Sequence, residues 1–362
     1  MSEIHGGDIY RNQVKLDFSV NINPLGMPKE VEKALVQSVG ECTRYPDIHA
    51  QKLRAGLAQL LKAEPWQVVF GNGASELFMA LIHALRPKKV LLPIPSFYGY
   101  EYAAKAAGSE IMYYPLREEE SFVLDEKLCG MVLDEKLCGM LSEDIDLLFL
   151  TNPNNPTGRR IRPQTLLTIL EDCKRKGIYV VLDECFIGFC GEEYSMIERV
   201  KEFPGLLIVR AFTKLYAIPG VRLGYLVCGE EELALQINSQ LPEWNLSVPA
   251  QRAGEACLGL ADYRKRTLSY IREERNCLLG GLRKLGLKVF EGDGDFLLLY
   301  SEIPLYERLL EKGILIRNCE NFKGLSRGYY RIAVKRREEN ERLQKAIGEC
   351  IEQDRICAAR RD

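Results

Sequence analysis

The sequence predicts an α/β protein, with a large, mostly parallel seven-stranded sheet between helices and a smaller α+β domain. Three observations predict this fold. Seven short apolar runs lie between residues 66 and 228, helical segments separate them, and further short strands follow residue 285. Several runs are apolar at consecutive positions, which is typical of strands that helices cover on both faces. The runs are Val68–Phe70, Val90–Leu92, Ile111–Tyr114, Leu147–Leu150, Ile178–Leu182, Leu206–Val209 and Leu223–Val227.

The first 45 residues are predicted to be an arm rather than a domain. A brief alternation at Leu16–Ser19 is followed by turn residues at Asn21–Gly26. Helices are expected over Pro28–Val39 and from about Ala50 to Leu61, with a break between them at Arg44–Asp47. A further helix, Glu76–Leu85, follows the first apolar run.

The second domain is predicted from the change of pattern after Asn245. A long helical segment covers Ala250–Leu285, and a terminal helix begins at about Glu338. Strands are expected near Lys288–Phe290, Phe296–Leu299, Ile314–Ile316 and Tyr330–Val334. We therefore assign residues 46–245 to the large domain, and residues 1–45 and 246–362 to an arm plus a small domain to which the arm returns.

A nine-residue stretch, Val123–Met131, is repeated at once as Val132–Met140. An insertion of nine residues turns a helix by about half a circle, so both copies cannot present the same face to one core. We interpret the repeat as a local duplication that forms a loop or helical extension at the surface.

The composition excludes several classes of function. A net charge of −2, with 46% hydrophobic and 28% charged residues, argues against nucleic acid or a membrane as partner. The first residues lack the basic and apolar regions of a signal peptide, so we predict a cytoplasmic protein. The 12 cysteines include no Cys-x-x-Cys pair and there are 3 histidines, so no metal site is predicted.

Polar motifs follow three of the predicted strands, at the sheet edge where open α/β proteins bind ligands. Asp183 ends one apolar run, Asn155 lies in the turn motif Thr151–Gly158, and Lys214 follows Leu206–Val209. Each motif alone is explained by turn or capping chemistry. A carboxylate buried after five apolar residues, however, needs a cationic partner.

A fourth motif, Gly71–Ser75, follows the first strand and opens a helix, where exposed amides and glycines suit a phosphate. A dinucleotide fingerprint would need glycine where Glu76 stands. Arg222 could add a charged contact to the same phosphate. Phe97 could stack on a flat ring, although core packing explains it equally well.

Lys214 lies in an apolar frame that lowers the pKa of its amine, so that it could attack a carbonyl and form a Schiff base. A lysine whose stem lies on the surface is the common alternative. A phosphate cup, an aromatic ring, an amide, a carboxylate and a desolvated lysine are together the parts that pyridoxal 5′-phosphate requires.

The chain resembles the class I/II aminotransferases, pyridoxal-phosphate enzymes of fold type I. The motifs are Asn155–Gly158, Asp183-Glu184, Thr213-Lys214 and Arg222–Gly224. The resemblance implies that Lys214 binds the cofactor aldehyde, Asp183 the pyridine nitrogen and Asn155 the ring's O3′ oxygen. It further implies phosphate contacts from Ala74, Ser75, Thr213 and Arg222, stacking by Phe97, and a homodimer in which Tyr45 reaches the neighbouring subunit's phosphate.

Within the family, the chain is most similar to the histidinol-phosphate aminotransferase branch and to threonine-phosphate decarboxylase of cobalamin synthesis. The segments His5–Tyr10, Phe18–Gly26 and Ile314–Cys319 favour the decarboxylase. That resemblance implies that His5, Asn23, Arg317 and Arg331 bind a phosphorylated amino-acid substrate. A disordered terminus is the alternative for His5.

Two positions depart from the family pattern: Phe186 replaces a tyrosine that bonds O3′, and Ala211 replaces a hydroxyl residue near the phosphate. We predict a decarboxylase acting on L-threonine-O-3-phosphate. An aminotransferase of the histidinol-phosphate type is the alternative, and a non-catalytic cofactor-binding protein is a remote one.

Overall fold

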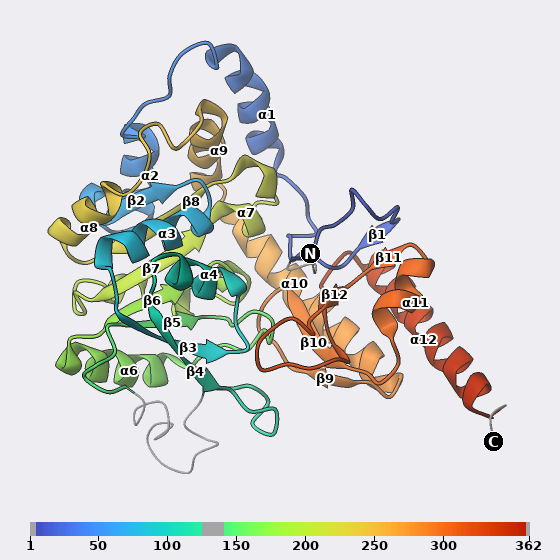
Figure 1. Ribbon diagram of the computed structural model, residues 1–362. Helices are drawn as coiled ribbons and strands as arrows, with labels where there is room; N and C mark the ends of the chain where they lie inside the picture. Colours follow the sequence, from blue (N-terminus) through green and yellow to red (C-terminus); the bar gives the residue numbers. More distant parts are fainter. Residues whose placement is uncertain (1–4, 125–140, 360–362) are drawn as a thin grey trace.

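The computed structural model describes residues 5–124 and 141–359, and its α/β architecture confirms the predicted fold class (Figure 1). The large sheet has the strand order β2-β8-β7-β6-β5-β3-β4. All neighbouring strands are parallel, except that β8 is antiparallel to both β2 and β7. Its strands are β2 (Val68–Gly71), β3 (Lys89–Ile94), β4 (Glu110–Pro115), β5 (Leu147–Thr151), β6 (Tyr179–Asp183), β7 (Leu206–Ala211) and β8 (Gly224–Cys228).

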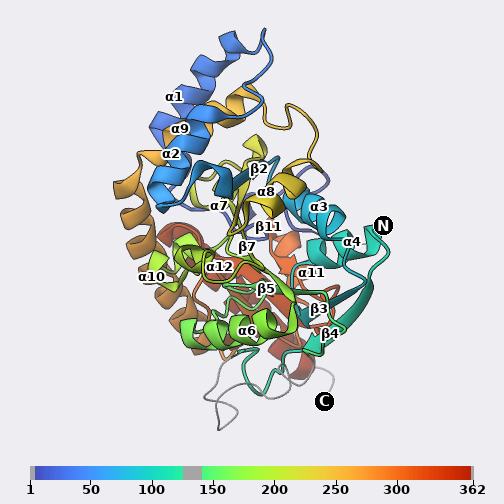
Figure 2. The same ribbon diagram turned by 90° about the vertical axis from the view of Figure 1, so that its left-hand side faces the viewer.

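Helices cover both faces of this sheet, which explains why its strands are apolar at consecutive positions. On β6, Val181 belongs to the core that includes α3, α4 and α8, whereas Val180 and Leu182 belong to the core that includes α2, α6 and α9. At one end of the molecule, α1 and α2 pack against α9 (Figure 2). The helices named so far are α1 (Lys29–Ser38), α2 (Gln51–Leu61), α3 (Ala74–Leu85), α4 (Tyr98–Ala106), α6 (Pro163–Lys176), α8 (Glu231–Asn238) and α9 (Val248–Leu258).

The smaller region contains an antiparallel sheet of order β12-β13-β10-β9. Leu16 and Phe18 of the amino-terminal arm are buried in its core, and β1 of the arm pairs in parallel with β11. The predicted domain boundaries themselves stay a prediction. The elements are β1 (Leu16–Asp17), β9 (Lys288–Phe290), β10 (Phe296–Tyr300), β11 (Ile314–Leu315), β12 (Arg317–Asn318), β13 (Tyr329–Ala333), α11 (Leu305–Glu311) and α12 (Arg337–Ala359).

The helical segment predicted over residues 250–285 is divided in two. Helix α9 ends at Leu258, and α10 (Ala261–Lys284) begins after Gly259 and Leu260. Between β7 and β8 lies a single helical turn, α7 (Phe212–Leu215). Short 3₁₀ turns complete the connections: η1 (Val39–Glu41), η2 (Pro65–Gln67), η4 (Ile187–Phe189), η5 (Glu192–Tyr194), η6 (Ile197–Arg199) and η7 (Pro219–Val221).

The duplicated stretch lies almost entirely outside the described residues, so its predicted conformation is untested. Among the helices that the structure describes, none combines the length and apolar character needed to cross a bilayer. Within the same residues, no group of three or more histidine, cysteine, aspartate or glutamate side chains could hold a metal ion. The nine cysteines whose side chains are described are free thiols.

Candidate active site

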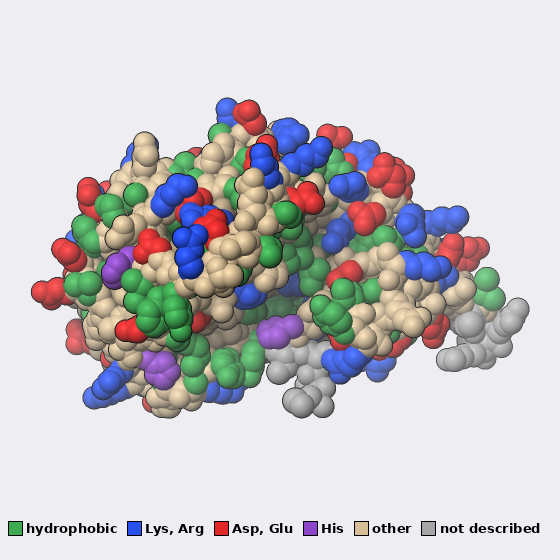
Figure 3. All heavy atoms as spheres, turned by 90° about the horizontal axis from the view of Figure 1, so that it is seen from above, with side chains coloured by type: hydrophobic (Ala, Val, Ile, Leu, Met, Phe, Trp, Pro, Cys, Tyr) green, Lys and Arg blue, Asp and Glu red, His purple; other side chains and the backbone are tan. Residues whose placement is uncertain are grey.

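A cavity of about 350 Å³ brings together the predicted site residues, except Tyr45 and Asn23. Seen from above, the surface is hollowed between the large and small regions, and Lys or Arg side chains are visible in the hollow (Figure 3). The predicted residues that line it are His5, Ala74, Ser75, Phe97, Asn155, Asp183, Thr213, Lys214, Arg222, Arg317 and Arg331.

Lys214 lies on α7, directly after β7, so its amine enters the cavity from the carboxyl end of a sheet strand. Burial lowers the pKa of this amine, and the positive charges of Arg331 and Arg222 lower it further. The carboxylate of Asp295 opposes this shift. A lowered pKa increases the neutral fraction of the amine, and the neutral form is the one that attacks a carbonyl carbon.

Asp183 ends β6 and points its carboxylate into the same cavity. Its Oδ1 accepts a hydrogen bond from the Cys185 backbone N–H at 2.9 Å, and its Oδ2 accepts one from the Tyr100 hydroxyl at 2.5 Å. The Thr151 hydroxyl donates in turn to the Tyr100 oxygen at 2.9 Å. Burial raises the pKa of Asp183, although these donors and Lys214 act in the other direction.

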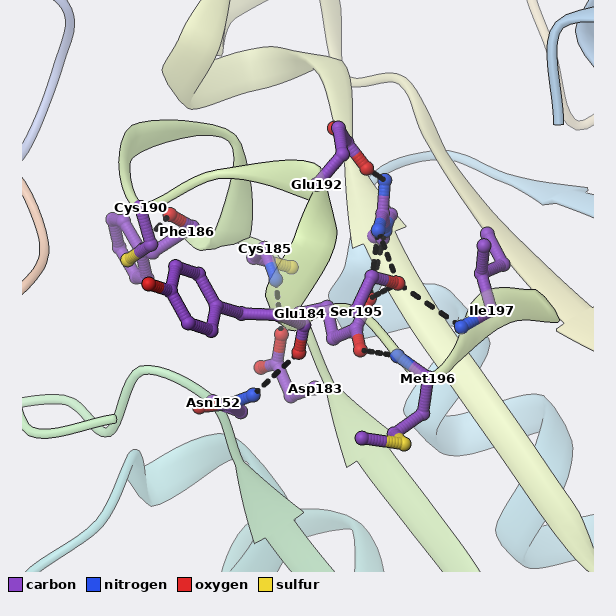
Figure 4. Close-up of polar contacts among 12 residues, drawn as sticks. Asn152, Asp183, Glu184, Cys185, Phe186, Cys190, Glu192, Ser195, Met196 and Ile197 are labelled. Carbon is purple, nitrogen blue, oxygen red and sulfur yellow. Dashed lines mark hydrogen bonds and ion pairs between the residues drawn. The ribbon is translucent and has the colours of Figure 1, made fainter. Parts of the chain in front are cut away.

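A buried ion pair ties together the strand ends that carry Asp183 and Lys214. Arg210, on β7, donates to Glu184 Oε2 from Nε at 3.0 Å and from Nη2 at 2.8 Å. Glu184, next to Asp183, also accepts from the Ser195 hydroxyl at 2.7 Å and the Met196 N–H at 2.9 Å (Figure 4). The exposed fractions of the Arg210 and Glu184 side chains are 7% and 0%. This pair therefore links β7 to the end of β6.

The phosphate cup at the start of α3 depends on two glycines. Gly73 has φ +81°, and a Cβ there would lie 2.3 Å from Arg222 Nη2. A Cβ on Gly224 of β8 would lie 2.8 Å from the Ala74 backbone nitrogen. Because these two glycines have no side chain, the Arg222 guanidinium and the start of α3 can both approach the cavity. This arrangement suits an anion.

Replacing Gly73 with alanine should weaken retention of a phosphorylated ligand at least about tenfold. The new Cβ displaces the Arg222 guanidinium, and a charge-assisted hydrogen bond contributes roughly 1.5–3 kcal/mol. Fluorescence titration of the apoenzyme with pyridoxal phosphate measures the effect. Gly220→Ala is the matched control, because a Cβ at Gly220 meets no atom within 4 Å. Equal dissociation constants for the two variants would contradict the assignment of the cup.

Two buried arginines line the cavity from the side of the small region. Arg331, on β13, donates from Nη1 to Asn155 Oδ1 and from Nη2 to the Ser19 carbonyl at 2.7 Å. Arg317, on β12, donates from Nη2 to Asn321 Oδ1 at 2.7 Å. Arg331 links the Asn155 turn of the large sheet to the arm, so cofactor and substrate contacts would be coupled through it.

The arm carries His5 over the cavity. The Gly7 N–H donates to the Ser19 hydroxyl at 2.8 Å, and a Cβ on Gly6 would lie 2.3 Å from the Ser19 carbonyl oxygen. The imidazole of His5 lies 6.0 Å from the ring of Phe97, centroid to centroid. Burial lowers the pKa of His5, and the positive charges of Arg317, Arg331 and Lys214 lower it further.

Asn23 and Tyr45 are the predicted site residues that do not reach the cavity. The Asn23 amide nitrogen donates to the Leu215 carbonyl at 2.7 Å and to the Thr267 hydroxyl at 2.8 Å. Asn21, two residues earlier, lines the cavity instead. Tyr45 is 80% exposed, and its ring lies 4.9 Å from that of Trp244.

Sequence reasoning missed three contributors: the Tyr100 hydroxyl on Asp183, the Glu184–Arg210 pair, and Asn21. A signal existed for the pair, because Arg210 follows four buried apolar residues and a buried guanidinium needs a carboxylate.

Both departures from the family pattern lie at the cavity wall. Phe186 packs its ring 5.1 Å from that of Phe296, and Ala211 offers a methyl group where a hydroxyl was expected.

The residues that line the cavity fit pyridoxal phosphate. Among the described residues, the Asp183 carboxylate faces the cavity with neutral hydrogen-bond donors only, so a protonated ring nitrogen would supply the missing cation. The Gly73 cradle and Arg222 suit the phosphate. The Lys214 amine lines the same space, where an aldehyde would meet it.

Comparisons with known proteins agree with this geometry. The family model described as aminotransferase class I and II matches residues 13–347. The chain is 37% identical to threonine-phosphate decarboxylase of Salmonella typhimurium, over 92% of this chain and 90% of that protein. It is 31% identical to histidinol-phosphate aminotransferase of Thermococcus gammatolerans, over 93% of this chain and 92% of that protein.

The solved structures include histidinol-phosphate aminotransferase from Clostridium acetobutylicum, with a TM-score of 0.85 and 31% identity, over 93% of this chain and 99% of that one. The resemblance drawn from the motifs is therefore confirmed. The family's cofactor is pyridoxal 5′-phosphate, and the relatives that match this chain are decarboxylases and aminotransferases. The protein belongs to the class I and II aminotransferase family and is a pyridoxal-phosphate-dependent enzyme.

Proposed function

We propose that the protein decarboxylates L-threonine-O-3-phosphate. The observation that carries this proposal is the pair of buried arginines, Arg317 and Arg331, that line one cavity with the His5 imidazole. A substrate with a carboxylate and a phosphate needs two anion-binding groups besides those at the cofactor phosphate. The relative from Salmonella typhimurium that bears this activity in its name supports the same substrate.

The cofactor, when bound, supplies an electron sink for the bond broken at the substrate's Cα. Asp183 would hold the ring nitrogen in its protonated form, and Tyr100 orients the Asp183 carboxylate. Lys214 would hold the cofactor's aldehyde carbon and, once released, carry a proton at Cα. Thr213, Ser75 and Arg222 would fix the phosphate end.

The arginines would select the bond that breaks. Loss of carbon dioxide requires the bond from Cα to the carboxylate to stand perpendicular to the cofactor ring. Arg331 is held by Asn155 and the Ser19 carbonyl, so it can grip an anionic group in one fixed orientation. His5 would donate a hydrogen bond to the substrate phosphate, and the negative charge of the phosphate would raise the pKa of His5. We assign the asparagine contact to Asn21 rather than Asn23, because only Asn21 lines the cavity.

Amino transfer of the histidinol-phosphate type is the second candidate. It is favoured by the solved structure from Clostridium acetobutylicum and by the relative from Thermococcus gammatolerans. It would use the same lysine, carboxylate and phosphate cup, but Lys214 would remove the Cα proton.

We further propose a homodimer in which Tyr45 enters the neighbouring subunit's site. The exposure of Tyr45, beside the 43% exposed Trp244, supports this role. Its position outside its own subunit's cavity is consistent with such an exchange.

Paired assays distinguish the two reactions. The holoenzyme is incubated with threonine phosphate, and separately with histidinol phosphate plus 2-oxoglutarate. We expect carbon dioxide release from the first mixture and little glutamate from the second. Rapid glutamate formation without gas would overturn the decarboxylase proposal and favour the aminotransferase.

A further inference from the structure

Asn23 is buried beside the turn that carries Lys214, although it does not line the cavity. Its exposed fraction is 2%. Its backbone N–H donates to the Lys214 carbonyl at 3.2 Å, and its side-chain amide donates to the Leu215 carbonyl at 2.7 Å. One residue of the amino-terminal arm therefore bonds two consecutive carbonyls of α7.

The α7 turn needs such donors because it is too short to be stable by itself. It contains 4 residues, and the last carbonyls of any helix have no partner within that helix. A single turn is also unfavourable to form, since several residues are fixed for one hydrogen bond. The Ala217 N–H donates to the Lys214 carbonyl as well, at 3.2 Å, so the contact that the Asn23 side chain adds is the one to Leu215.

Asn23 is itself held in place by further contacts. Its Oδ1 accepts from the Leu25 N–H at 3.0 Å, and its carbonyl accepts from the Gly26 N–H at 3.1 Å. Its Nδ2 also donates to the hydroxyl of Thr267, a residue of α10 that is 0% exposed, at 2.8 Å. The Tyr263 hydroxyl, again from α10, donates to the Gly26 carbonyl at 2.6 Å. The arm is therefore fixed to α10 at the place where it contacts α7.

We propose that Asn23 is a positioning residue, which holds the backbone of Lys214 so that the lysine amine meets the cofactor aldehyde. When this bond forms, the Lys214 nitrogen joins the aldehyde carbon and water leaves. A turn that is already fixed loses little freedom on forming the bond, so it holds the aldehyde more tightly than a loose turn would. The inference rests on the proposed function only in assigning this bond to Lys214.

This role differs from the substrate contact that the resemblance implied for Asn23. The side chain of Asn21 lines the cavity, whereas that of Asn23 lies between α7 and α10. Ser19, in the same segment, accepts from Arg331 Nη2 at 2.7 Å. One short segment of the arm therefore contacts an arginine of the small region, lines the cavity and holds the turn that carries Lys214.

The test compares two ligands that differ only in the group to which Lys214 bonds. Pyridoxal phosphate carries the aldehyde, whereas pyridoxamine phosphate has the same ring and phosphate but an aminomethyl group in its place. The apoenzyme is titrated with each ligand by fluorescence. In Asn23→Ala, the dissociation constant for pyridoxal phosphate should rise about fivefold, the factor that one typical hydrogen bond contributes, and that for pyridoxamine phosphate should not change. A wild-type ratio of the two constants would overturn the inference, because a merely structural role weakens both ligands alike.

Asn340→Ala is the matched control. Asn340 is 1% exposed, and its side-chain amide donates to Glu274 Oε2 at 3.1 Å and to the Lys335 carbonyl at 2.8 Å. It therefore holds two segments together as Asn23 does, but it does not contact α7. This variant should lower the melting temperature and leave the ratio of the two constants unchanged. An equal change of the ratio in Asn340→Ala would also overturn the inference.

Asn23→Ser covers the case in which Asn23→Ala does not fold. Serine keeps a side-chain acceptor for the Leu25 N–H but is too short to reach the Leu215 carbonyl. The ratio should change in the same direction as in Asn23→Ala, and an unchanged ratio would contradict the proposed role. These titrations use no substrate, so they stand apart from the decarboxylase assay. Borohydride attachment at residue 214 of the wild type tests the assignment of Lys214 separately.

Discussion

Replacing Lys214 with alanine should lower the turnover number at least about a thousandfold. Proton transfer by a positioned side chain alone supplies roughly 10²–10⁴ in rate, and the variant also loses the amine that holds the cofactor aldehyde. Stopped-flow and long-incubation assays of the enzyme reconstituted with pyridoxal phosphate measure the decrease in turnover number. Borohydride treatment should fix the cofactor on the peptide that contains residue 214 in the wild type and leave it unattached in the variant.

Lys214→Arg is the matched control for charge. It keeps a cation at position 214 but cannot bind the aldehyde, so it should fold like the wild type and remain inactive. Borohydride attachment at another lysine of the wild-type protein would contradict the assignment of Lys214.

Replacing Arg210 with methionine should destabilise the fold by about 3–5 kcal/mol, because Glu184 would be left as an uncompensated buried charge. The Glu184 carboxylate is fully buried, and Arg210 supplies two of its hydrogen bonds. Urea unfolding followed by circular dichroism measures the loss.

Two controls separate the buried pair from the general effect of removing charge. Glu192→Gln removes a partner of Arg210 whose side chain is 60% exposed, and should cost less than about 1 kcal/mol. Adding Glu184→Gln to Arg210→Met should restore part of the stability, since no unpaired charge remains. A double variant no more stable than Arg210→Met would show that Arg210 acts by packing alone.

The meeting of Asp183 and Lys214 in one cavity could be predicted because strand ends are local features of the sequence. Asp183 and Lys214 each follow an unbroken apolar run, and parallel strands carry such residues to one edge. The seven predicted runs all lie in strands of the large sheet, and cores on both of its faces agree with their consecutive apolar residues.

Features that lie in irregular backbone could not be predicted from the sequence. Asn21 and Asn23 lie in the same arm, where no periodicity shows which side chain faces the cavity. Asp295 follows Gly292-Asp293-Gly294, which is typical of an exposed turn, and its burial arises from α10 and β13 packing around it. The break between α9 and α10 depends on Gly259 and Leu260, and a single glycine inside a helical pattern is tolerated too often to mark an end.

The fate of two labels on one substrate tests the central claim most directly. Threonine phosphate carrying carbon-13 in its carboxylate and deuterium at Cα is incubated with the holoenzyme, and products are followed by NMR and mass spectrometry. We predict that the carbon-13 appears as carbon dioxide while the deuterium stays in the phosphorylated amino alcohol. An oxoacid that retains the carbon-13 and has lost the deuterium would contradict the account.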